Sequence, residues 1–268
     1  TVKIFFFAAL SLLISSVSAE TNNQPPQKST REIINELRVL LKNKNPLQQI
    51  DILSEAYKRY SNNIGASSYI LQVMAEQDSM AGETKKALHS WDTDYRKTSF
   101  SNGELPTNYQ TVDAIEQISN QAKSHSIVMV NEAHHAPQHR VLTFKLLDKL
   151  WLQGYRYFAV ETLAATFASN IFDSYILRKA GFYTREPIFS QLILKAKKIG
   201  YKLVAYDYDH AHSHKAREIN SAKKIKTKIF DKDPEAKVLI HVGFSHIEED
   251  STWLAAVLRS ETGFILAT

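Results

Sequence analysis

The interpretation of the chain starts from residues 127–139, which read IVMVNEAHHAPQH. The apolar and largely β-branched run Ile127–Val130 predicts a short buried strand. An acid and histidines follow directly, and Pro137 then suits the first turn of a helix. A buried strand that leads through a polar turn into a helix is the repeating unit of an α/β domain with a parallel sheet.

The same alternation of strands and helices continues to the end of the chain. Further strands are predicted at 155–160, 202–206, 238–242 and 264–267, and helices near 109–123, 138–153, 187–199, 214–230 and 252–260. We therefore expect a three-layer α/β domain over 109–268, with a largely parallel sheet flanked by helices on both faces.

The helix predicted at 138–153 is the best defined of these helices. It has a wide apolar stripe, and its charged residues Arg140, Lys145, Asp148 and Lys149 lie outside that stripe. We expect this helix only to pack on the sheet.

Residues 31–108 precede the α/β domain and have helical periodicity, with further helices near 67–77 and 82–95. Residues 80–91 resemble the second half of a tetratricopeptide-type hairpin. One or two such hairpins do not form an independent solenoid, which favours a helical cap on the main domain. A module that binds a peptide or protein partner is the alternative.

The first residues of the chain have the features of an export signal. Lys3 supplies a positive charge, residues 4–14 form a short apolar stretch, and Val17, Ser18 and Ala19 form a small-residue cleavage site. The polar, proline-bearing residues 20–30 predict a linker. We expect a signal peptide over 1–19, a periplasmic or secreted protein, and no stable membrane anchor after cleavage.

Composition excludes several classes of function. The 268 residues are 44% hydrophobic and 23% charged, which is typical of a folded protein. The chain has no cysteine, so disulfides, cysteine-ligated zinc and iron–sulfur clusters are excluded. Its formal charge of +5 is dispersed and does not indicate nucleic-acid binding. Any metal or cofactor must be held by histidine, carboxylate or tyrosine.

Polar residues follow four of the predicted strands. The carboxyl ends of parallel strands meet at one edge of a sheet, which we call the rim, and open α/β sheets bind ligands there. A single acid or histidine would be an ordinary loop residue, but this coincidence predicts acid–base or metal chemistry. Seven of the ten histidines are expected at the rim, and the candidate residues are Glu132, His134, His135, His139, Glu161, Asp207, His210, His212, His214 and His246.

Local context refines some of these candidates. Glu132 and Glu161 end apolar strands, so burial would raise their pKa values unless a histidine or a helix N-terminus compensates. His139 lies in the first turn of a helix, which favours the neutral imidazole. His135 is four residues before His139, but the intervening proline weakens the case for a helical metal pair. Arg217 begins a helix near the rim and could hold a substrate carboxylate.

Residues 127–163 and 238–250 together resemble the superfamily of erythromycin esterases, ChaN-like haem-binding uptake proteins and Tiki proteins, which are exported α/β proteins. A glutamate ends the second strand in this group, matched by Glu161. A late Gly-x-x-His is matched by Gly243 and His246. The resemblance covers roughly 110–268 and does not extend to the helical region.

The turn after the first strand lies between two branches of that superfamily. Erythromycin esterases carry Gly-Glu-x-Thr-His-Gly, which makes Glu132 and His135 the matching pair. ChaN-like proteins carry Gly-Glu-x-His-Asp followed by a proline and a second histidine, and the matching residues are Glu132, His134, Pro137 and His139.

The esterase branch implies hydrolysis of an ester or lactone without a covalent intermediate. His135 would take a proton from water, Glu132 would orient it, and Glu161 and His246 would polarise or protonate the reacting groups. The lack of a G-x-S-x-G elbow agrees with this reading. A Tiki-like variant would instead cleave peptides with a divalent metal, and its candidate ligands are His134, His135, His246 and Asp207.

The ChaN branch implies haem or iron binding rather than catalysis. His134, His135 or His246 would be an axial ligand, His139 would also contact the cofactor, and Arg217 would face a propionate. A third possibility is an exported interaction protein that uses its helical region. Of the three we expect the hydrolase first, acting on a small molecule or a peptide.

Overall fold

A computed structural model describes residues 28–95, 110–207 and 213–268. The predicted signal peptide and most of the predicted linker lie outside these residues, as do His210 and His212. None of the helices in the three ranges has the length and apolar composition of a membrane span.

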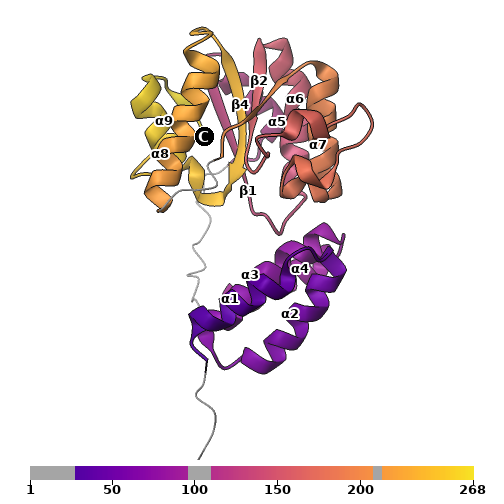
Figure 1. The fold of residues 1–268 in the computed structure, drawn as a ribbon. Coiled ribbons are helices and arrows are strands. Elements are labelled where there is room, and N and C mark those ends of the chain that lie inside the picture. The colour runs from indigo at the N-terminus through magenta and orange to yellow at the C-terminus, as the bar shows by residue number, and fades with distance from the viewer. Residues whose placement is uncertain (1–27, 96–109, 208–212) are drawn as a thin grey trace, which may run out of the picture.

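Within the described residues, five strands form one sheet in the order β3-β2-β4-β1-β5 (Figure 1). Every pairing is parallel, which confirms the predicted α/β architecture. The strands are β1 (Ile127–Glu132), β2 (Tyr155–Val160), β3 (Lys202–Ala205), β4 (Lys237–Gly243) and β5 (Leu266–Ala267).

Helices cover both faces of the sheet, as the three-layer prediction requires. Side chains of a strand alternate between faces. Val128 and Val130 pack with one set of helices, and Ile127 and Met129 pack with the other. The first set is α5 (Ala114–Ala122), α6 (His139–Leu152) and α7 (Pro187–Ile199); the second is α8 (His214–Ile225), which continues as a π-helical turn over Lys226–Phe230, and α9 (Leu254–Thr262).

The strand order determines what meets at the rim. β1 and β4 are neighbours, and their register pairs Glu132 with Gly243 at their carboxyl ends. β2 lies on the other side of β4, and its Val160 pairs with His241. The chain leaves β1 towards α6 on one face and leaves β4 towards α9 on the other, and open α/β sheets commonly bind ligands at such a point.

The connection from β2 to α7, residues 161–186, has no long helix or strand. It contains the short 3-10 turns Phe167–Asn170, Arg178–Ala180 and Tyr183–Arg185. An antiparallel bridge between Leu163 and Gly181 closes its base. A Cβ atom at Gly181 would lie 2.6 Å from the carbonyl oxygen of Thr162, so the two sides of this connection pack closely.

The N-terminal region is helical, as predicted, and has a core of its own. Ile33, Leu37, Leu53 and Ile70 are buried together in this core. Its likeness to a tetratricopeptide hairpin stays a prediction. The helices are α1 (Thr30–Leu41), α2 (Pro46–Tyr60), α3 (Ile64–Met80) and α4 (Thr84–Tyr95).

The helical region contacts the rim through α4. Trp91 stacks on His135, with ring centroids 4.0 Å apart and an interplanar angle of 16°. Figure 1 shows α1–α4 gathered as a group of their own beside the α/β domain. A helical cap over the carboxyl edge of the sheet would make a contact like that between Trp91 and His135.

Candidate active site

Glu132, the last residue of β1, is the most densely bonded acid at the rim. Arg140 binds it with two hydrogen bonds, from Nε to Oε2 at 2.6 Å and from a terminal nitrogen to Oε1 at 2.7 Å. His134 Nδ1 lies 2.9 Å from Oε1, and His241 Nε2 lies 2.8 Å from Oε2. Burial by itself would raise the pKa of Glu132, but Arg140 and the two histidines hold it well below its usual range.

Arg140 is the main correction to the sequence interpretation. It is only 1% exposed, and it also donates to Glu186 Oε2 at 2.7 Å. Its guanidinium lies over the rings of Tyr183 and Phe189. The expectation that the helix after β1 only packs on the sheet is wrong, because its first turn directs Arg140 to the buried end of β1 instead of to solvent.

His134 is oriented by Glu132 and directed at Glu161. Its Nε2 lies 4.0 Å from Glu161 Oε2, its ring stacks on Tyr183 at 4.4 Å, and its side chain is 26% exposed. Burial opposes protonation of His134, but the hydrogen bond to Glu132 and the charge of Glu161 outweigh it and raise the pKa of His134. A Cβ atom at Gly243 would lie 2.7 Å from His134 Nε2, so a larger residue there would displace this ring.

Glu161 follows β2 and lies at the centre of the rim. The amide of Gly243 donates to its Oε2 at 2.6 Å, and Arg217 donates to its Oε1 at 2.6 Å. His246 Nε2 lies 3.6 Å from Oε1. The next residue, Thr162, has φ of 60°, a left-handed conformation that costs energy in a β-branched residue and is often found beside functional groups.

His246 lies in the 3-10 turn Phe244–Ile247 after β4, and a second buried acid orients it. Its Nδ1 lies 2.7 Å from Oε2 of Glu218, a residue of α8. His214 Nε2 lies 3.5 Å from the other oxygen of Glu218. The ring of Trp253 lies nearly perpendicular to both imidazoles.

His134 and His246 therefore form two similar arrangements around Glu161. Each imidazole has a buried carboxylate at Nδ1, and each directs Nε2 at a different oxygen of Glu161. The separations of 4.0 and 3.6 Å are longer than a hydrogen bond. Both Nε2 atoms can therefore still exchange a proton with a further group. Such an arrangement can perform general acid–base chemistry.

The structure corrects the partner that was expected for Glu132. The residue that Glu132 orients is His134, whereas His135 stacks on Trp91. Nδ1 of His135 is buried and has no hydrogen-bond partner within the described residues. Burial, with a smaller effect from the charge of His139, lowers the pKa of His135 to about 4, so this imidazole is neutral at pH 7.

His139 and Arg217 have structural partners of their own. His139 is the first residue of α6, and its Nδ1 accepts a hydrogen bond from the Ala133 amide at 3.1 Å. Arg217 is paired with Glu161 and also with Asp207, at 2.9 Å from its Nε. The predicted contacts of His139 and Arg217 with a cofactor or substrate stay predictions, but the guanidinium of Arg217 is already engaged by two carboxylates.

The four candidate metal ligands are separated by their other contacts. His135 is stacked on Trp91, and Asp207 is paired with Arg217. Within the part of the chain that the structure describes, no group of three or more histidine or acidic side chains is arranged to hold a metal ion.

Several site residues were missed by sequence reasoning: Arg140, Glu186, Glu218, His241 and Glu76. Only His241 and Glu218 left a signal in the sequence. His241 interrupts the apolar strand Val238–Val242, and Glu218 is the one acid on a helix rich in lysine. Glu76, on α3, left none, because its place near His134 depends on how the helical region docks. Burial raises the pKa of the Glu76 carboxyl.

Comparison with known proteins identifies no relative of this chain. No model of a protein family matches it, and neither a curated protein nor a solved structure does. The resemblance of residues 127–163 and 238–250 to the esterase, ChaN and Tiki superfamily stays a prediction.

Proposed function

We propose that this chain is a hydrolase that activates water with His134 and cleaves an ester, a lactone or a peptide without a covalent intermediate. The observation that carries the proposal is the convergence of His134 and His246 on Glu161. Each imidazole is held by a buried carboxylate, an arrangement that fixes the tautomer and orientation of a catalytic base.

In this mechanism, Nε2 of His134 removes a proton from the attacking water. The hydrogen bond from Nδ1 to Glu132 stabilises the imidazolium that forms. Because Arg140 keeps Glu132 ionised, the carboxylate remains an acceptor throughout the reaction. The charge of Glu161 favours the same protonated state of His134.

His246 supplies the second proton transfer. Its Nε2 gives a proton to the leaving group, and Glu218 at Nδ1 supports it as Glu132 supports His134. Arg217 and the Gly243 amide hold Glu161 between the two imidazoles. The assignment follows the esterase branch of the resembled superfamily, but it gives His134 the role of base that the motif alone gave to His135.

The test is a substrate screen with the full chain. Nitrophenyl esters, lactones and peptides are assayed with His134→Ala, His246→Ala and Glu161→Gln. His89→Ala is the matched control, since His89 is an exposed residue of α4. We expect the control to keep full activity and His134→Ala to lose about 100-fold to 10,000-fold in kcat.

Two further arms separate the alternatives. If a chelator abolishes the activity and a divalent ion restores it, a metal ion and not His134 activates the water. Haemin is titrated with the unaltered chain and with His134→Ala. A saturable Soret shift that disappears in this variant, without any hydrolysis, would favour haem binding. Full activity in both histidine variants would contradict the proposal.

A further inference from the structure

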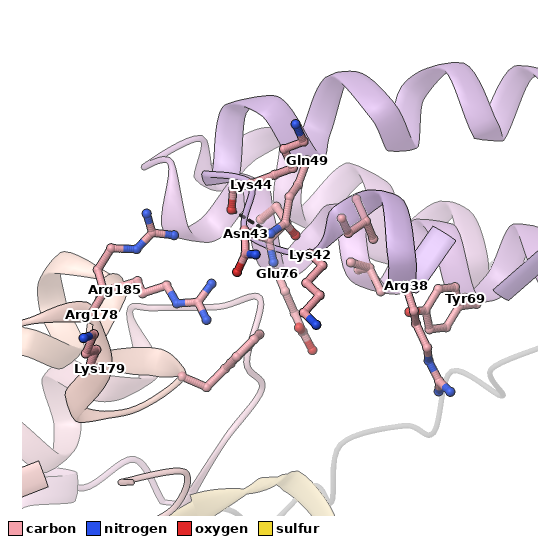
Figure 2. A pocket seen from close by; sticks show the side chains of 14 residues that line it. Arg38, Lys42, Asn43, Lys44, Gln49, Tyr69, Glu76, Arg178, Lys179 and Arg185 are labelled. Carbon is pink, nitrogen blue, oxygen red and sulfur yellow. Dashed lines mark hydrogen bonds between the residues drawn. The ribbon is translucent and has the colours of Figure 1, made fainter. Parts of the chain in front are cut away.

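A cavity of about 630 Å³ lies between the helical region and the β2–α7 connection. One wall comes from α1, the turn after it and α3, and the other comes from residues 178–185 (Figure 2). Its volume is in the range of sites that bind small molecules. The cavity adjoins the rim through Glu76, but no histidine of the described residues lines it.

The charge that lines this cavity is strongly one-sided. Its acidic lining among the described residues is Glu76, and its basic lining is Arg38, Lys42, Lys44, Arg178, Lys179 and Arg185. Six cations and one acid leave a formal charge of +5, which equals the formal net charge of the whole chain.

Among the described residues, these cations have no acidic partner within ion-pair distance. The ion pairs of the described residues use other basic side chains, such as Lys195, Lys197 and Arg217, and none of the six forms one there. Figure 2 shows Arg178 and Arg185 extending towards the corner of the helical region that carries Lys42 and Lys44. Six cations beside a single acid repel one another, and a bound anion would reduce that repulsion.

Arg185 has a buried donor nitrogen that faces no acceptor among the described residues. It is partly buried, and its Nε has no hydrogen-bond partner in the described part of the chain. Its guanidinium lies 4.9 Å from the centre of the Phe182 ring, which holds it beside the cavity. Burial, together with the charge of Arg178, lowers the pKa of Arg185. Buried donors are ordinarily paired, so this nitrogen calls for an acceptor.

We propose that the cavity between α1, α3 and residues 178–185 binds a small oxyanion with two or more negative charges. The planar guanidinium fork matches the oxygens of a phosphate or a carboxylate, and three of the six cations are arginines. Ligands of this chemistry are phosphorylated molecules and polycarboxylates. The inference stands independently of hydrolysis at the rim.

The experiment measures binding of pyrophosphate and of citrate to the full chain by calorimetry. The double variant Arg178→Gln/Arg185→Gln removes one wall of charge. A second double variant, Lys42→Gln/Lys44→Gln, removes charge from the opposite wall, so the test does not depend on one variant folding. Lys145→Gln is the matched control, since Lys145 is exposed on α6 and forms no ion pair within the described residues.

We expect affinity for at least one anion to fall about tenfold or more in each double variant and to be unchanged in the control. Binding of pyrophosphate alone would assign the site to phosphorylated ligands, and binding of citrate alone would assign it to polycarboxylates. The proposal is overturned if neither anion binds, or if Lys145→Gln weakens binding as much as the double variants do.

Discussion

The rim and the basic cavity handle charge in opposite ways. At the rim, Glu132, Glu161 and Glu218 are buried, and each faces arginine or histidine side chains of the protein itself. In the cavity, six cations face one acid and form no ion pair among the described residues. Charges that are paired within the protein orient side chains for a reaction, whereas unpaired charges of one sign favour an external partner.

The comparison is tested most strongly by removing the central cation of the rim. Arg140→Met leaves Glu132 and Glu186 buried without their shared guanidinium. We expect the free energy of unfolding to fall by about 3–5 kcal/mol, because an uncompensated charge is left in a buried site. Urea unfolding at pH 7 measures this loss. A loss below about 1 kcal/mol would mean that Glu132 is not held by Arg140.

The next test concerns the contact that joins the helical region to the rim. His135 has a pKa of about 4 in the folded chain and an ordinary value near 6.5 in the unfolded chain. Between these values the unfolded state binds more protons, so stability falls as the pH drops from 6.5 to 4, by up to about 3 kcal/mol. His135→Phe keeps a ring against Trp91 and removes the titration.

Stability is therefore measured by urea unfolding at several pH values between 4 and 6.5. We expect a flatter dependence on pH in His135→Phe than in the unaltered chain. His89→Ala, at an exposed position of α4, is the control and should keep the original slope. Equal slopes in all three proteins would show that His135 is not desolvated by the helical region.

Much of the fold could be predicted because residues close by in the sequence mark where helices and strands begin and end. β2 and α7 were placed at their observed residues, and α7 is bounded by Pro187 at its start and by Gly200, with φ of 116°, at its end. Such signals act within a few residues of the helix end, so they can be recognised from the sequence alone. The π-helical turn over Lys226–Phe230 had no comparable signal.

The candidate site was predicted less completely, for a physical reason. Residues that directly follow strands, such as Glu161 and His246, were expected at the rim and do lie there. The partners of these residues come from other elements, so which of His134 and His135 meets Glu132 depends on packing that the motif does not encode. Arg140 was missed for the same reason, since its polar character on a helix usually indicates exposure.

The smallest effect on stability is expected when the same change, arginine to glutamine, is made once in each region. This pair of variants also compares the two regions most directly. Arg217→Gln removes the cation that joins Glu161 and Asp207, and we expect it to cost about 1 kcal/mol or more even though Arg217 is partly exposed. Arg185→Gln removes no ion pair and relieves repulsion with Arg178, so stability without added anion should change by less than about 0.5 kcal/mol. Both are measured by urea unfolding in a chloride buffer of low ionic strength. If Arg185→Gln destabilises the chain as much as Arg217→Gln, the cations of the cavity stabilise the folded chain and do not form a site for an external anion.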